Sequence, residues 1–83
     1  MRLFKFERHG DYFCFVLLWA QDATKQTITL NRDAVSGVSI ANSNDTYNVS
    51  IFLKGVSDEI GFKADLKQCE TMHKTMFDFD LCL

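Results

Sequence analysis

A thiol and an imidazole lie one helical turn apart in the segment Cys69-x-x-x-His73. At ~100° per residue this spacing puts both side chains on one side of a helix, and Cys82 or His9 could add further zinc ligands. The spacings are not those of a closed zinc knuckle, and a Cys–His nucleophile would also need an exposed cleft and an orienting group. We therefore expect a buried thiol beside a half-buried histidine, with no metal and no cofactor.

Other catalytic patterns are missing from the sequence. It contains no glycine-rich phosphate loop, no GxSxG elbow and no HExxH motif. The adjacent carboxylates Asp58 and Glu59 fall in a predicted turn, where acidic side chains stay solvated. We therefore expect the protein not to be an enzyme.

Phe52 interrupts the polar face of its predicted strand. An exposed aromatic side chain with Lys54 nearby, and with Arg2, Lys5 and Arg8 elsewhere, could imitate a sheet on which RNA bases stack. The formal net charge of −2 has the wrong sign for neutralising phosphates, which argues against a nucleic-acid partner.

The charge is uneven along the chain. The first 41 residues carry five Lys/Arg and four Asp/Glu, whereas residues 42–83 carry four and seven. An acidic second half favours a protein partner with a basic surface. The odd number of cysteines, three, and the lack of a CxxC pair favour a reducing cytoplasm over a disulfide framework.

The candidate contact residues and the Cys69–His73 pair fall on predicted elements of one small domain, a sheet and a helix. Eighty-three residues make a single domain, 1–83, and the apolar run at 13–20 falls far short of the roughly 20 residues of a membrane helix. We expect that run to be a strand buried on both faces, and we expect no membrane association. Further strands are predicted at 2–7, with Phe4 and Phe6 on one face, and at 27–31, 35–41, 46–54 and 59–63.

The expected class is α+β: a mainly antiparallel meander of about six strands with one C-terminal amphipathic helix packed on it. Asp65 and Gln68 resemble a capping box at the start of that helix. Gly37 is expected to mark a bulge. The core is expected to contain Phe13, Phe15, Val16, Leu17, Val49, Ile51 and Leu66.

The tail at 78–83, DFDLCL, alternates apolar and acidic residues at the period of a strand. It is either a seventh strand or an extended arm, with Phe79, Leu81 and Leu83 on one side. Its acidic side would steer the tail toward basic residues of a partner. The residues expected to contact a partner are Phe52, Asp58, Glu59, Asp78, Phe79, Asp80 and Leu81.

The small size, acidic charge and sheet-plus-helix composition resemble the motif-free proteins with which bacteriophages block host defences, the anti-CRISPR type among them. That resemblance implies an inhibitor that occludes or mimics a surface of a defence complex in the host cytoplasm, and it assigns no residue. The predicted elements also look like a pleckstrin-homology-like barrel, although no basic phosphoinositide loop stands out.

Three functions stay open from the sequence. The first is a non-enzymatic protein-binding module. The second is an oligomer, a homodimer or larger, that sequesters a small ligand such as a nucleotide. The third is a structural subunit that assembles through the edges of its sheet.

Overall fold

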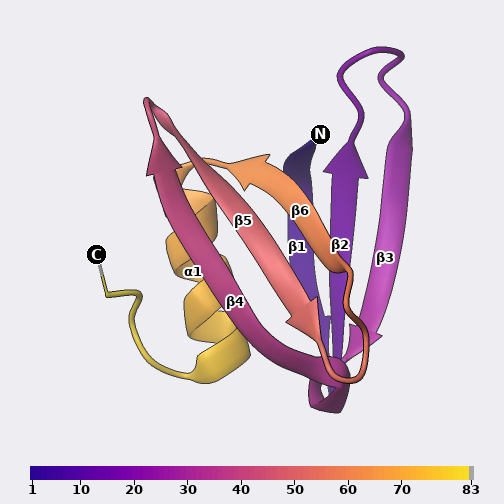
Figure 1. Ribbon diagram of the computed structural model, residues 1–83, viewed down its shortest axis with the longest axis vertical. Coiled ribbons are helices and arrows are strands. Elements are labelled where there is room, and N and C mark those ends of the chain that lie inside the picture. Colours follow the sequence, from indigo (N-terminus) through magenta and orange to yellow (C-terminus); the bar gives the residue numbers. More distant parts are fainter. Residues whose placement is uncertain (83) are drawn as a thin grey trace.

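The computed structural model describes residues 1–82 and confirms the α+β class, with a mostly antiparallel sheet and one C-terminal helix. Figure 1 shows the arrangement. A one-turn 3-10 helix, η1 (Arg32–Ala34), links β3 to β4. The strands and the helix are β1 (Arg2–His9), β2 (Tyr12–Leu18), β3 (Lys25–Asn31), β4 (Val35–Ser43), β5 (Thr46–Leu53), β6 (Glu59–Ala64) and α1 (Leu66–Phe77).

The strand order is β3-β2-β1-β6-β5-β4, so the expected meander holds within each half of the sheet but not across its centre. β1 and β6 are parallel and pair only at Arg2 and Lys63. The outer strands β3 and β4 are separated in the chain by η1 alone, so the sheet must curl to bring these ends together. In Figure 1 the β4–β6 half accordingly crosses in front of the β1–β3 half.

Local turn chemistry explains the hairpins. Gly10 has a φ of 61° in the turn between β1 and β2, a conformation that glycine adopts without steric cost. Asn44 has a φ of 59° between β4 and β5, and asparagine tolerates this region better than most residues. The register of β4 shifts between Val35 and Gly37, which confirms the bulge expected there.

The core lies between the two halves of the sheet, and α1 contributes one side to it through contacts with β1 and β5. Figure 1 shows α1 passing behind β4 and β5. Every second residue of β2 and of β5 points inward, as the period of a strand requires. The buried side chains are Leu3, Phe13, Phe15, Leu17, Val49, Ile51, Phe62, Ala64, Cys69, Met72 and Met76.

Two expectations about the core are wrong. β2 is fully buried on one face only, and Val16 on its other face is half-buried, as are Cys14 and Leu18. Leu66 is 39% exposed because it starts α1, one turn before the helix first meets the core at Cys69. The other five predicted core residues are buried.

The predicted capping box of α1 is confirmed. The carboxylate of Asp65 accepts a hydrogen bond from the backbone of Gln68, and the Gln68 side chain accepts one from the backbone of Asp65. The helix ends at Asp78, which is left-handed with a φ of 63°. Within residues 1–82, no helix has the length and the apolar character needed to cross a membrane.

The tail is not a seventh strand, because residues 79–82 have no regular structure. Its start folds back onto the end of α1. The ring of Phe79 meets that of His73 edge-on at 4.9 Å between centroids, and Leu81 packs partly against the core. Leu83, expected on the same side as Phe79 and Leu81, lies outside the described residues.

Candidate functional site

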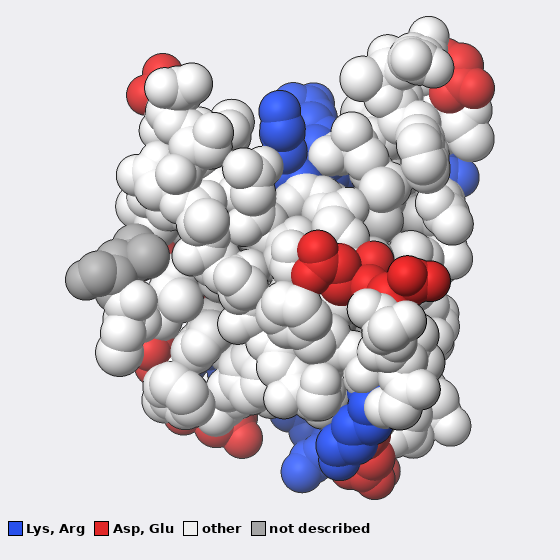
Figure 2. All heavy atoms as spheres, in the orientation of Figure 1, with Lys and Arg blue, Asp and Glu red and all other residues white. Residues whose placement is uncertain are grey.

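The structure brings three of the predicted contact residues together on the outer surface of β5 and β6. Phe52 lies directly opposite Glu59 in the strand register, and Asp58 precedes β6 by one residue. Phe52 is 40% exposed and lies beside Gly37 of β4. Figure 2, in which β5 and β6 lie in front, shows acidic side chains gathered across the middle of this face. We call Phe52, Asp58 and Glu59 the Phe52 patch.

The other four predicted contact residues lie at the end of α1. Asp78 terminates the helix, Phe79 is exposed, and Leu81 is half-buried. Asp80 is almost fully exposed, with its carboxylate 3.8 Å from the Lys74 ammonium. Residues 78–82 form an irregular turn, not an extended strand. The predicted acidic side of the tail is therefore not a continuous surface.

The Cys69 and His73 side chains are poorly placed for chemistry. Cys69 is fully buried, and this desolvation, together with the nearby charges of Asp65 and Glu70, raises the pKa of the thiol to about 11. His73 directs Nδ1 at the Phe79 carbonyl oxygen, 3.1 Å away. Residues 1–82 bring together no group of three or more His, Cys, Asp or Glu that could hold a metal ion.

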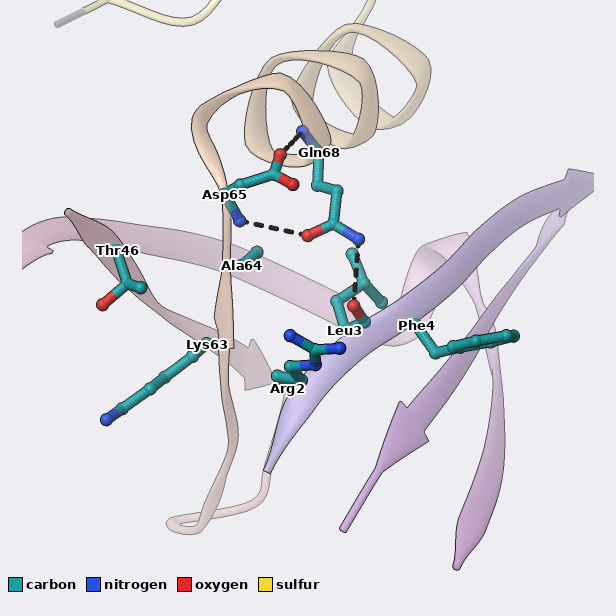
Figure 3. A pocket seen from close by; sticks show the side chains of 8 residues that line it. All are labelled: Arg2, Leu3, Phe4, Thr46, Lys63, Ala64, Asp65 and Gln68. Atoms are coloured by element: carbon teal, nitrogen blue, oxygen red, sulfur yellow. Dashed lines mark hydrogen bonds between the residues drawn. The ribbon is translucent and has the colours of Figure 1, made fainter. Parts of the chain in front are cut away.

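A groove lies between β1 and α1, and no pattern in the sequence predicted it. It consists of two hollows, of about 240 and 310 Å³, that share Leu3, Phe4, Asp65 and Gln68. Figure 3 shows the first of them. We call the recess the β1–α1 groove. It is lined by residues 2–6 and by Thr46, Lys63, Ala64, Asp65, Lys67, Gln68, Thr71 and Met72.

A bulge in β1 lies at the wall of this groove. In Figure 3 the Phe4 side chain extends from β1 away from Arg2 and Lys63. The pairing of β1 with β2 shifts between Leu3 and Lys5, so Phe4 is an extra residue in β1. Bulges redirect side chains, and here Phe4 is 50% exposed and lines both hollows, whereas Phe6 packs against the core. The expectation that Phe4 and Phe6 share one face is therefore wrong.

The groove exists because α1 replaces β6 beside β1. β6 pairs with β1 only between Lys63 and Arg2, the first residue of β1, and the backbone N–H of Lys63 donates to the Met1 carbonyl at 3.0 Å. Beyond that point Gln68 Nε2 of α1 donates to the Leu3 carbonyl at 2.9 Å. Farther along, Arg8 Nη1 donates to the Thr75 carbonyl at 3.2 Å. Side chains rather than backbone bonds thus join β1 to the helix, which leaves the space between them open.

Gln68 holds the centre of the groove. Its Oε1 accepts from the Asp65 backbone at 3.0 Å while its Nε2 donates to Leu3, and Figure 3 shows both bonds. The Asp65 carboxylate in turn accepts from the Gln68 backbone at 2.8 Å. The only acidic side chain that lines the groove is therefore engaged in capping α1.

The groove is basic although the chain is acidic. Arg2, Lys63 and Lys67 line it, are exposed, and form no ion pair within residues 1–82. Lys25 lies over the Phe4 ring, with 4.2 Å from Nζ to the centroid. In Figure 2 basic side chains occupy the notch between the two upper lobes, where β1 begins and β6 ends in Figure 1.

Lys5 is the exception among the cations of the groove. Its Nζ lies 2.6 Å from the Glu7 carboxylate, and both side chains are well exposed. The hydrogen bond and charge of Glu7 raise the pKa of Lys5, and those of Lys5 lower the pKa of Glu7. Lys5 is therefore partly neutralised, whereas the other three cations are not.

Comparison with known proteins identifies no relative: no family model matches, and no curated protein or solved structure shows significant similarity.

The signal for this groove in the sequence is weak. The segment Arg2–Phe6 mixes two basic residues with three apolar ones, which is typical of many exposed strands. The bulge at Phe4 involves no glycine, and the approach of Lys63 to Arg2 depends on the parallel pairing of β1 with β6. Only the capping motif at Asp65 and Gln68 was visible in advance, and it predicts a helix start rather than a binding site.

Proposed function

We propose that this protein is a non-enzymatic protein-binding module whose β1–α1 groove receives an acidic, partly apolar segment of a partner. The observation that carries the proposal is a recess that is lined by the exposed residue Phe4 and by Arg2, Lys63 and Lys67, three cations without an ion-pair partner within residues 1–82. In a chain of net charge −2, this concentration of free cations favours an acidic ligand.

The size of the groove favours side chains over a whole small molecule. Taken singly, its hollows of about 240 and 310 Å³ lie close to the lower limit of ligand pockets, about 300 Å³, so each fits one side chain. A phenylalanine or leucine of the partner would contact Phe4 and the stem of Lys67, while neighbouring carboxylates would meet Arg2 and Lys63. Aromatic and arginine side chains are the groups that most often dominate binding energy at interfaces.

A second candidate surface is the Phe52 patch. The pairing of Phe52 with Glu59, next to Asp58, supports contact with a basic surface of a partner. Its three residues line neither hollow of the β1–α1 groove, and they line none of three further hollows within residues 1–82. We place it second because charges outside a recess are less well shielded from water than charges within one.

Inhibition of a host defence complex is one form that this function would take. The small size, acidic charge and absence of catalytic motifs support this form. The groove would then cover an acidic segment of the complex. Alternatively, the Phe52 patch would cover a basic segment of it.

The proposal can be tested with two pools of short capped peptides, one composed of Glu, Asp, Leu and Phe and the other of Lys, Arg, Leu and Phe. In fluorescence anisotropy, we expect the acidic pool to bind the wild type. We expect the double variant R2E/K63E to bind it about tenfold or more weakly, a loss of ~1.4 kcal/mol. The double variant D58K/E59K is the matched control and is expected to retain binding.

Three results would contradict the proposal: equal binding of both pools, no binding of the acidic pool, or equal weakening in the two double variants. Displacement of the acidic peptides by excess ATP would instead favour the sequestration of nucleotides.

A further inference from the structure

β4 is an outer strand of the sheet with one unused side. Within residues 1–82 it pairs with β5 alone, and no backbone hydrogen bond joins its other side to any strand. Figure 1 shows β4 at the margin of its half of the sheet. Alternate N–H and C=O groups along that side are therefore free to pair with another strand.

The sequence of β4 does not protect this edge. Natural sheets block exposed edges with charged side chains, proline or bulges, but VSGVSIANS contains neither charge nor proline. The bulge near Gly37 lies close to the start of the strand and leaves residues 38–43 regular. The opposite edge strand, β3, differs because it carries Lys25.

The side chains of β4 fit a strand laid beside it. Ser39 and Ala41 are small, exposed and directed outward, so they leave the edge accessible. Val38 and Ile40 point inward and are only half-buried, although both pack against the core. A neighbouring strand with its own apolar residues on that face would cover them and extend the core.

A second copy of the chain meets these requirements. In an antiparallel pair about a twofold axis at Ser39, Val38 of one copy lies opposite Ile40 of the other, so apolar residues meet on the inner face. Gly37 lies opposite Ala41, so small residues meet on the outer face. The neutral strand brings no like charges face to face, whereas a highly charged partner strand would find no complementary charge here.

We infer that two copies of this protein associate through antiparallel pairing of β4 with β4, which joins the two sheets into one. This interface is separate from the β1–α1 groove, which involves β1, β6, α1 and the first residue of β5, so a dimer would carry two grooves.

The test compares lysine substitutions on the two edge strands. By sedimentation across the micromolar range, we expect the wild type to form dimers. We expect Ser39→Lys to raise the dimer Kd about tenfold or more, because it places two ammonium groups opposite each other. Thr27→Lys, on the exposed outer face of β3, is the matched control and is expected to leave the Kd unchanged. Circular dichroism should show that both variants are folded.

Hydrogen exchange provides a second measurement on the unmodified chain. We expect the β4 amides that do not bond to β5 to become protected as concentration rises, while β3 amides at the opposite edge stay unprotected. A wild type that remains monomeric throughout would overturn the inference. So would a dimer that Ser39→Lys leaves intact or that Thr27→Lys disrupts.

Discussion

Phe4 and Phe52 are both exposed phenylalanines on strands, yet their surroundings are opposite. Phe4 is 50% exposed at a bulge of β1, between two hollows, with Lys25 over its ring. Phe52 is 40% exposed on the outer face of β5, opposite Glu59. The exposure of an aromatic ring therefore does not by itself indicate a binding site. A recess and free charges of one sign distinguish the β1–α1 groove from the Phe52 patch.

Both regions depend on the same core, and its loss gives the largest expected effect. Leu17 is fully buried between the two halves of the sheet. We expect Leu17→Ala to lower the free energy of unfolding by about 2–5 kcal/mol, since it leaves a cavity where the halves meet. Val16→Ala, one residue away on the half-buried face, is the control and is expected to cost less. Urea denaturation measures both, and equal costs would contradict the assignment of the two faces.

Removal of the Gln68 side chain affects only one of the two regions, because Gln68 lines the β1–α1 groove and does not belong to the Phe52 patch. We expect Gln68→Ala to lower the free energy of unfolding by about 1–3 kcal/mol, since it breaks the capping box and the bond to Leu3. Gln68→Glu keeps an acceptor for the Asp65 backbone but cannot donate to Leu3, so its effect is expected to be intermediate. Thermal unfolding of both variants provides the measurement. A Gln68→Ala variant as stable as the wild type would show that α1 does not need this attachment.

The two phenylalanines themselves differ in their expected contribution to binding. We expect Phe4→Ser to weaken the binding of acidic peptides about tenfold, because the ring supplies the apolar part of the groove. Phe52→Ser is expected to change this affinity by less than about twofold. Anisotropy titrations of the two variants at equal salt concentration give the comparison, and a reversal of the order would identify the Phe52 patch as the site.

Substitution of Glu7 is expected to change peptide affinity least, and it tests whether the free charges of the β1–α1 groove determine binding. Glu7→Gln releases Lys5 into the groove, so we expect acidic peptides to bind about two- to threefold more tightly. Because Lys5 lowers the pKa of Glu7 in the folded protein, the pair contributes stability above the ordinary pKa of a glutamate, and this is lost as the pH falls through the lowered value. The extra affinity of the variant should vanish at high salt, which screens the charge of the released Lys5. A gain that persists there would have another cause.

Local patterns in the sequence predicted the local structure well. The capping box at Asp65 and Gln68, the bulge at Gly37 and the inward face of β5 depend on neighbours within a few residues, and the structure confirms all three. The order of the strands does not depend on such neighbours. A short turn after β3 suggests a hairpin with β4, whereas η1 instead carries the chain to the opposite edge of the curled sheet.

The candidate site was less predictable for the same reason. Phe52 and Glu59 come together because two strands share a register, and the sequence had suggested both residues without suggesting their contact. The groove depends on a bulge without glycine and on a parallel pairing between residues 61 positions apart in the chain, Arg2 and Lys63. Neither feature leaves a pattern in a single sequence.

The most direct test of the account is a chemical-shift map of the ¹⁵N-labelled protein during titration with the acidic peptide pool. We expect the largest changes at the backbone amides of Phe4, Lys63 and Gln68 and at the Gln68 side-chain amide, with little change at Phe52 and Glu59. Changes centred on Phe52 and Glu59, or spread evenly over the surface, would contradict the claim that the β1–α1 groove is the binding site.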